Sequence, residues 1–499
     1  MFKMRTVKTR SGKTAVQVVF RHSHRTEIVQ HIGSAGNDKR LLELKKLAGQ
    51  IIRQKDPQIA LFPKETENDR GSDLVLVGNL DAVKYRHLFA YEYLSRFYTL
   101  NGFDQLENQL VKDLAVIRVI EPSSKLRSLM LLKKYFGVIH SENVLYKTFG
   151  SLERLQSRAE GLAVDYAKKH LHFDFSLVFY DVTTLYFETF NEDISINDSN
   201  NPKRHGLRRF GFSKDNKPGQ PQILIALVVN TDGYPVAVNI FEGSKFEGHT
   251  MIPVILDLKT KYRITNLTVV ADAAMLSAKN MEELDKLGLQ YIVGARLSYL
   301  SSDLLQQIST ALNKQPGKYF RTKTPLGYLV CDYSDLRAAK DRSDRRKQLV
   351  RAQSQIDNPA KFFRRSRFVR ETTASVYEIN QKLIEKDELL DGIKGYCTNL
   401  KDTDNTIIVS RYKDLWKIEK AFRIAKSDLL ARPIFHRKKE NIKAHILIVF
   451  ISLCMVKSIE LQTGQSIRNV RDKIWEVLDI ELKDKLTGKT YVKRTSVNN

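Results

Sequence analysis

Three carboxylates, Asp181, Asp272 and Glu419, are the residues of this sequence whose types and surroundings could do chemistry together. Asp181 and Asp272 each follow an apolar run, LVFY and LTVVA, that predicts a buried strand. A buried, unpaired carboxylate is costly and tends to take up a proton, so Asp181 needs a cation, a shell of hydrogen bonds or a metal. Glu419 lies in a helical pattern over residues 410–433.

Separated carboxylates of this kind suit the binding of hard divalent cations. Mg²⁺ prefers oxygen ligands and usually keeps water and substrate phosphates in its shell. Two such ions about 4 Å apart can activate an attacking oxygen and stabilise the leaving oxygen in phosphoryl transfer. A metal would give Asp181 its partner. Taken alone, Glu419 is more simply a surface carboxylate that pairs with Arg423 at i+4.

The pattern over residues 410–433 predicts one helix with two distinct faces. Its apolar residues recur at about 100° per residue and form a core-facing stripe of Leu415, Ile418, Phe422, Ala425 and Leu429. Tyr412, Glu419 and Lys426 are seven residues apart each time and share a neighbouring face, with Arg423 close to them. This face is placed to point at a site beside the core.

The rest of the chain supplies the elements that must position these residues. Alternating patterns predict a small β-module over 1–35, a basic helix follows at 37–54, and 62–73 predicts a linker. Helical patterns dominate 80–172. Strand patterns then occur at 176–187, 222–230, 234–241, 267–273 and 291–296, with helical patterns at 248–262 and 277–287. This order predicts a mixed α/β sheet rather than a TIM barrel.

The C-terminal half adds a basic segment and further helices. Residues 300–390 are dense in Arg and Lys, which fits a solvated helical face or a surface for the phosphate backbone of nucleic acid. A strand is predicted at 392–400, followed by helices to about residue 480. The apolar stretch 446–456 is too short to span a bilayer and predicts a buried helix.

Composition limits the classes of partner and compartment. The chain has 82 Lys and Arg against 57 Asp and Glu, a net charge of +25, which favours a polyanion such as nucleic acid, although a basic enzyme of another kind could share it. The widely separated Cys331, Cys397 and Cys454 fit neither a disulfide framework nor a zinc site. No apolar targeting segment follows the N-terminus, so a cytoplasmic protein without membrane contact is expected.

Several ordered motifs make residues 80–460 resemble a known family. The motifs are YDVTTLYFE (180–188), RRFGFSKD (208–215), FEGSKFEGHT (241–250), VVADAAMLS (269–277), YIVGARL (291–297) and IEKAFRIAKSDLLARPIFH (418–436). Together they resemble the DDE transposases of bacterial insertion sequences, in the branch named for a Tyr-Arg-Glu-Lys signature.

The resemblance implies an RNase H-like catalytic domain whose Asp-Asp-Glu triad falls on Asp181, Asp272 and Glu419. The triad would bind two Mg²⁺ ions, with Mn²⁺ able to replace them. The enzyme would cut DNA at an element end and join the freed 3′-OH to target DNA. Its partners would be the double-stranded terminal inverted repeats, the target DNA and a second copy of the chain in a homodimeric synaptic complex.

The signature helix also implies residues that bind DNA. Leu415 stands where the signature has Arg, so that residue of the signature is missing here. The residues assigned to DNA binding on this basis are Tyr412, Lys426, Arg423, Arg432 and His436.

The expected fold is α/β, an RNase H-like core with a β-containing insertion, preceded by a small β-module and a helical domain. The expected segments are an N-terminal β/helix module (1–75), a helical DNA-binding domain (76–172), the first part of the core (173–300), a basic insertion (301–390), the second part of the core with Glu419 (391–460) and a helical tail (461–499). Two alternatives stay open: an RNase H-like nuclease that cuts without joining strands, and a non-catalytic DNA-binding protein derived from a transposase.

Overall fold

A computed structural model describes the chain except residues 1, 22–24, 56–78, 194–205, 276, 359–365, 374–375, 486 and 496–499. The predicted linker at 62–73 lies outside the described residues. The chain divides into two compact units, which we describe separately. The first unit comprises Met1–Tyr91, Lys134–Gly137 and Asp472–Asn499, and the second comprises Glu92–Lys133 and Val138–Arg471.

The first unit begins with the predicted β-module. Strands β1 (Phe2–Lys8), β2 (Thr14–Arg21) and β3 (Thr26–Ala35) form an antiparallel sheet in that order. Helix α1 (Asp38–Lys55) packs its apolar side chains against this sheet. The strand and helix predictions for this part of the chain are therefore confirmed.

A second sheet of the first unit joins segments that are far apart in the sequence. Strand β15 (Asp479–Asp484) pairs on one side with β16 (Thr490–Arg494) and on the other with β4 (Leu80–Arg86). The prediction that 461–499 is a helical tail is therefore wrong beyond α15 (Ile467–Trp475). The segments of β15 and β16 complete the backbone hydrogen bonds of β4, and local sequence pattern does not reveal such distant pairing.

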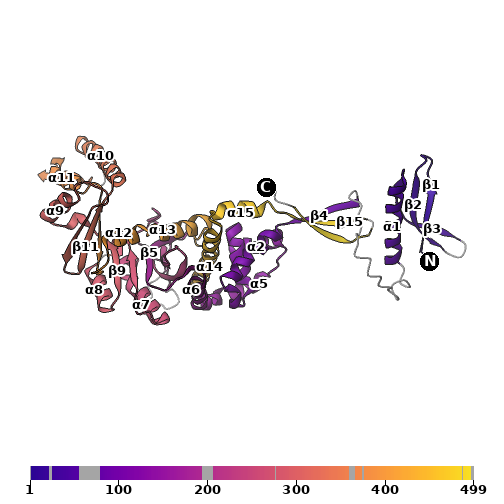
Figure 1. The fold of residues 1–499 in the computed structure, drawn as a ribbon, viewed down its shortest axis with the longest axis horizontal. Helices are drawn as coiled ribbons and strands as arrows, with labels where there is room; N and C mark the ends of the chain where they lie inside the picture. The colour runs from indigo at the N-terminus through magenta and orange to yellow at the C-terminus, as the bar shows by residue number, and fades with distance from the viewer. Residues whose placement is uncertain are drawn as a thin grey trace. The chain divides into compact units, whose positions relative to one another are not determined.

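The second unit contains the predicted helical segment. The segment forms α2 (Leu88–Leu100), which begins in the first unit, and then α3 (Gln109–Ile120), α4 (Lys125–Leu131), α5 (Glu142–Thr148) and α6 (Gln156–Leu171). The long helix α14 (Lys439–Thr463) returns to pack against α3, α6 and the central sheet (Figure 1). Among the described residues, α14 is the one helix long and apolar enough to cross a membrane, but 94% of its most apolar window is buried inside the protein. The predicted buried helix at 446–456 is confirmed.

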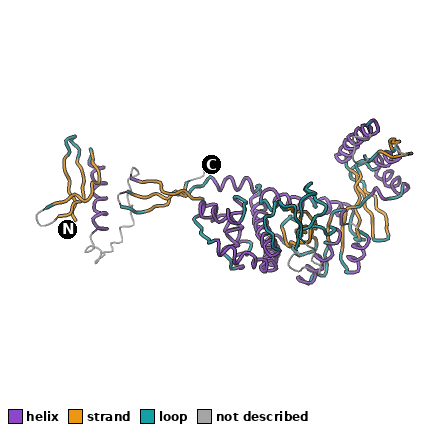
Figure 2. The backbone as a smooth tube through the Cα atoms, turned by 180° about the vertical axis from the view of Figure 1, so that it is seen from behind, coloured by secondary structure: helices purple, strands orange, loops and turns teal. Residues whose placement is uncertain are grey.

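The central sheet of the second unit is mixed, as predicted. Its first strands are β5 (Leu177–Tyr186), β6 (Gln222–Val229), β7 (Pro235–Glu242), β8 (Thr268–Ala271) and β9 (Gln290–Gly294). β5, β6 and β7 form an antiparallel meander, whereas β8 pairs parallel to β5 and β9 parallel to β8. Helices α7 (Met251–Tyr262) and α8 (Ala278–Lys286) link the later strands, and Figure 2 shows these strands among the helices of the unit. This is a mixed α/β, RNase H-like arrangement.

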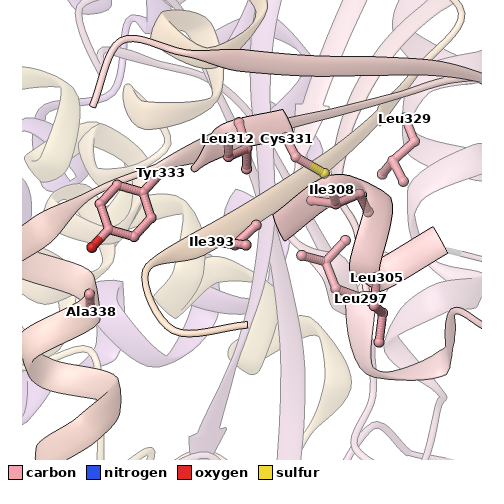
Figure 3. Packing of buried hydrophobic residues seen from close by; sticks show 9 residues of the cluster. All are labelled: Leu297, Leu305, Ile308, Leu312, Leu329, Cys331, Tyr333, Ala338 and Ile393. Carbon is pink, nitrogen blue, oxygen red and sulfur yellow. The ribbon is translucent and has the colours of Figure 1, made fainter. Parts of the chain in front are cut away.

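The basic insertion and the strand that follows it extend the same sheet. Strands β10 (Tyr319–Thr324), β11 (Gly327–Tyr333) and β14 (Ile393–Thr398) add antiparallel to the β9 edge, giving the order β10-β11-β14-β9-β8-β5-β6-β7. Helices α9 (Ser302–Leu312), α10 (Asp335–Asp357) and α11 (Gln381–Leu389) and the hairpin β12 (Val369–Thr373)–β13 (Val376–Ile379) complete it. Figure 3 shows its buried core, in which Leu305 and Ile308 of α9 pack near Cys331 of β11.

The predicted continuous helix over 410–433 is wrong. The segment instead contains α12 (Asn405–Lys413), α13 (Trp416–Arg423) and a π-helical turn, η10 (Ile424–Asp428). Between α12 and α13 the backbone bonds tighten to i→i−3 spacing, with the Leu415 N–H donating to the Tyr412 carbonyl at 3.0 Å. Hydrophobic spacing continues through this break, so the pattern alone does not show it.

Candidate active site

Asp181 and Asp272 lie side by side on neighbouring parallel strands. Asp181 is in the middle of β5, and Asp272 directly follows β8. Because Tyr180 pairs with Ala271 in the register of these strands, the two carboxylates occupy the next positions. In each, Oδ1 accepts a hydrogen bond from the backbone N–H of the following residue at 2.7 Å. The sheet therefore brings together the two acids that the sequence singled out.

The surroundings of Asp181 are short of positive charge. Burial raises the pKa of its carboxyl to about 6; Lys214 opposes this rise, while Asp272 and Glu247 add to it. Lys214 is itself engaged elsewhere, because its Nζ donates to the Val182 carbonyl at 2.6 Å and pairs with Glu247 at 3.1 Å. A partly buried carboxylate in this setting favours the approach of a cation.

Glu419 lies near this pair without joining it. The residue is exposed on α13, whose buried side carries Ile418 and Phe422. Glu419 and Asp272 both act electrostatically on the Lys394 ammonium and on Tyr412. Across the described ranges, no group of three or more His, Cys, Asp and Glu side chains is placed to hold a metal ion. The structure thus leaves Glu419 at the edge of the carboxylate pair.

Among the described residues, Glu419 forms no ion pair with Arg423, so the simpler expectation for Glu419 is not met. Arg423 is exposed at the end of α13. Leu415 is buried with a 6% exposed fraction, so the side chain at the signature Arg position packs into the core.

Tyr412 forms a hydrogen bond with Asp272. Its hydroxyl donates to Asp272 Oδ1 at 3.3 Å, and its side chain is buried. The Lys394 Nζ lies 4.5 Å from the centre of the Tyr412 ring, and the Tyr396 ring packs against it at 4.8 Å. Burial and the neighbouring Asp272 raise the pKa of the Tyr412 phenol, which keeps the hydroxyl a proton donor. Tyr412 is therefore placed to orient Asp272.

Gly294, at the end of β9, makes room for this tyrosine. A Cβ atom at Gly294 would collide with the Tyr412 hydroxyl and lie 3.1 Å from the Ala273 backbone nitrogen. We expect Gly294→Ala to lower the free energy of unfolding by about 2 kcal/mol, because an added methyl group in a packed region forces its neighbours to move. Urea unfolding measures this loss.

The control makes the same Gly294→Ala substitution in a protein that already carries Tyr412→Phe, which lacks the colliding hydroxyl. In it, Gly294→Ala should cost clearly less than in the wild type, since only the Ala273 contacts remain. Equal costs in the two backgrounds would show that Tyr412 is not what the glycine accommodates.

Lys426 and Arg432 converge on one carboxylate. Lys426 Nζ lies 3.0 Å and Arg432 Nη1 2.8 Å from Asp215 Oδ1, whose side chain is only 6% exposed. Burial lowers the pKa of the Lys426 ammonium, and its bond to Asp215 opposes this effect. Asp215 follows Lys214 in the chain, and Lys214 acts electrostatically on Lys426.

A comparison with protein families decides what this site belongs to. The family described as transposase DDE domain matches residues 189–455, more than half of the chain, including Asp272 and Glu419. The chain belongs to the transposase DDE domain family. Asp181 lies just ahead of the matched residues.

Among solved structures, a cryo-EM structure of a piggyBac transposase synaptic complex with hairpin DNA is similar to this transposase. The identity is 10%, the match covers 78% of this chain and 70% of that chain, and the TM-score is 0.35. A search of curated proteins finds no match.

The insertion of this transposase lines a cleft together with Asp272. The cleft has a volume of about 520 Å³ and reaches from Asp272 and Tyr412 to the helix α10. Four cations line it: Arg337, Arg345, Arg367 and Lys394. Arg345 is committed to Asp391 through two parallel hydrogen bonds of 2.5 and 2.7 Å. The same cleft is also lined by the carboxylates Asp341, Asp344, Asp387 and Asp391, so the charge beside Asp272 is mixed.

Three residues of the site had no role assigned from the sequence: Lys214, Asp215 and Glu247. All three lie in motifs that carried the family resemblance, RRFGFSKD and FEGSKFEGHT. The motifs were the signal that could have identified them. His436, by contrast, lies in a separate pocket, where its ring packs 5.0 Å from that of Phe149.

Proposed function

We propose that this transposase binds the ends of an insertion sequence and catalyses Mg²⁺-dependent cleavage and strand transfer. The observation that carries the proposal is the adjacency of Asp181 and Asp272 on parallel strands of a transposase DDE domain. The net charge of +25 supports double-stranded DNA as the partner, both as terminal inverted repeats and as target. We also propose a homodimeric synaptic complex and a cytoplasmic location.

The donor set fits a hard divalent cation. Asp181, Asp272 and Glu419 offer only carboxylate oxygens, and the raised pKa of Asp181 reflects the burial of a carboxylate that a bound cation would stabilise. We propose that these residues hold two Mg²⁺ ions, or Mn²⁺ in their place, with DNA phosphate and water as further ligands. When bound, the ions would activate the attacking oxygen and stabilise the leaving oxygen.

The remaining residues of the site have supporting roles in this proposal. Tyr412 orients Asp272 through its hydroxyl. Lys426 and Arg432, now on Asp215, would hold phosphates of the DNA end, and the exposed Arg423 would add a further cation. Such phosphate contacts fix the register of the DNA relative to the carboxylates.

The test uses DNA that carries the sequences flanking this gene, incubated with target plasmid and Mg²⁺. We compare the wild type with Glu419→Gln and with the control Asp257→Asn, an exposed carboxylate on α7. Cleavage at a repeat boundary and joined products are expected from the wild type and the control, and at least about 100-fold less from Glu419→Gln.

Other outcomes separate the alternatives. Cleavage without joined products would favour the nuclease. Binding to the same ends by all three proteins, with cleavage by none, would favour the non-catalytic DNA-binding protein and contradict the proposal.

A further inference from the structure

The second unit contains another pocket, with a volume of about 210 Å³ and a mainly apolar lining that includes Leu126 and Leu145. It lies between the start of α4, helix α5 and the segment that leads into α14. Six of its lining residues are Ser124, Lys125, Tyr146, Phe149, His436 and Asn441. None of them belongs to the carboxylate site.

Lys125 is the unusual member of this pocket. Its exposed fraction is 7%, and among the described residues it has neither an ion pair nor a hydrogen bond of its ammonium group. The Nζ atom lies 5.6 Å from the centre of the Phe149 ring. A buried ammonium without an anion is costly, and burial with the nearby Arg118 holds its pKa well below the usual value.

The charged groups around Lys125 are cationic. Arg118 is 4% exposed and donates to the carbonyls of Leu429 and Leu430 at 2.6 and 3.2 Å. Burial, Lys125 and Arg118 together lower the pKa of His436 to about 4 and also lower that of His445.

Two carboxylates on neighbouring turns are already paired. Glu121 binds Arg127 at 2.7 Å, and Glu153 binds Lys443 at 2.9 Å. No carboxylate of the described residues pairs with Lys125 or raises its pKa. The Lys125 amine therefore lines this pocket without a paired anion among the described residues.

We propose that this pocket binds a phosphate group of DNA on a segment next to the one that is cut. Lys125 and Asn441 would donate to the phosphate oxygens, and His436 would donate through a ring nitrogen. Ser124 Oγ accepts from the Arg127 N–H at 3.3 Å, which leaves its hydroxyl proton able to donate as well. Tyr146 is 66% exposed and leaves the pocket accessible. This inference rests on the proposed function in one respect, that the bound phosphate belongs to DNA.

The chain connects the pocket to the carboxylate site. Only three residues separate His436 from Arg432, which shares Asp215 with Lys426. The same short segment contains Ile434, whose N–H bonds to the Tyr186 carbonyl at the end of β5. One DNA strand could therefore meet both places, and the exposed Arg437 and Lys438 add positive charge beside His436.

The test is a binding measurement without Mg²⁺, on a duplex of about 40 base pairs taken from the gene's flanking sequence. Single phosphates of the duplex are replaced in turn by neutral methylphosphonates. We expect Lys125→Met to weaken binding roughly tenfold, as for loss of one charged hydrogen bond. At the phosphate that Lys125 contacts, the methylphosphonate should weaken DNA binding by the wild type. It should not further weaken binding by Lys125→Met, which has already lost that contact. The control Lys286→Met, at an exposed site on α8, should behave like the wild type.

Each other outcome overturns the inference. If every methylphosphonate affects Lys125→Met as it affects the wild type, Lys125 contacts no DNA phosphate. If inorganic phosphate raises the melting temperature of the wild type alone while the DNA scan shows no difference, the pocket takes a free anion instead. Because Lys125→Met removes a buried charge, we expect the melting temperature of the variant to rise. A lower melting temperature with unchanged DNA binding would instead show that Lys125 serves only to pack the pocket.

The experiments can distinguish a failure of this inference from a failure of the proposed function. DNA binding without Mg²⁺ does not require the carboxylates, so a Lys125 effect with no cleavage by the wild type would overturn only the proposed function.

Discussion

Replacing Asp181 with Asn should lower the rate of DNA cleavage by at least about 1,000-fold, because residues that act as a catalytic unit cannot substitute for one another. The substitution keeps the shape of the side chain, and amide and carboxylate oxygens can both accept the Val182 N–H. DNA binding without metal should therefore stay within about twofold. Single-turnover cleavage and a binding titration measure the two effects, with Asp257→Asn as control. A cleavage rate within tenfold of the wild type would remove Asp181 from the proposed catalytic set.

The same variant also carries a prediction for stability. Without metal, the pKa of Asp181 is about 6 in the folded chain, above the value of about 4 in an unfolded chain. The folded protein then binds more protons between these values, so its stability falls as the pH rises through them. Above pH 7, Asp181→Asn should be about 2 kcal/mol more stable than the wild type, and near pH 3 the two should be equal. Mg²⁺ should reverse the order at pH 8, and equal stability at pH 8 without metal would contradict the burial of this charge.

Asp215→Asn should give the largest loss of stability, about 3 kcal/mol. Asp215 is the anion shared by Lys426 and Arg432, and its removal leaves two cations facing each other at a mostly buried position. Urea unfolding of the variant measures the loss. In a Lys426→Met background the same substitution should cost less, because one of the two cations is already gone.

Asp215→Asn should affect stability and DNA affinity in different directions. Asp215→Asn frees Lys426 and Arg432 for phosphate, so binding to element-end DNA should be maintained or tightened despite lower stability. A loss below about 0.5 kcal/mol would show that solvent screens this cluster, and weaker DNA binding would argue that Asp215 itself positions the cations.

Much of the core could be predicted from sequence because its strands are short, apolar and bounded by turns. The pattern around Asp181 and Asp272 predicted two strands, and the family resemblance supplied the expectation that their acids meet. The break between α12 and α13 could not be predicted, since the apolar stripe of Ile418 and Phe422 continues through it. The cluster on Asp215 depends on bonds between segments more than 200 residues apart, which no local pattern contains.

The pairing of β15 with β4 has a consequence for the order in which a new chain folds. The backbone N–H of Phe89, just after β4, bonds to Asp479 of β15 across 390 residues. At about 5–20 residues per second, a ribosome needs roughly 20–80 s to make that stretch. Throughout this time β4 has an open edge, which is a template for pairing with other chains. The sheet that joins the two distant segments is thus a late step of biogenesis, and a chain that stops before β15 would carry the unpaired edge permanently.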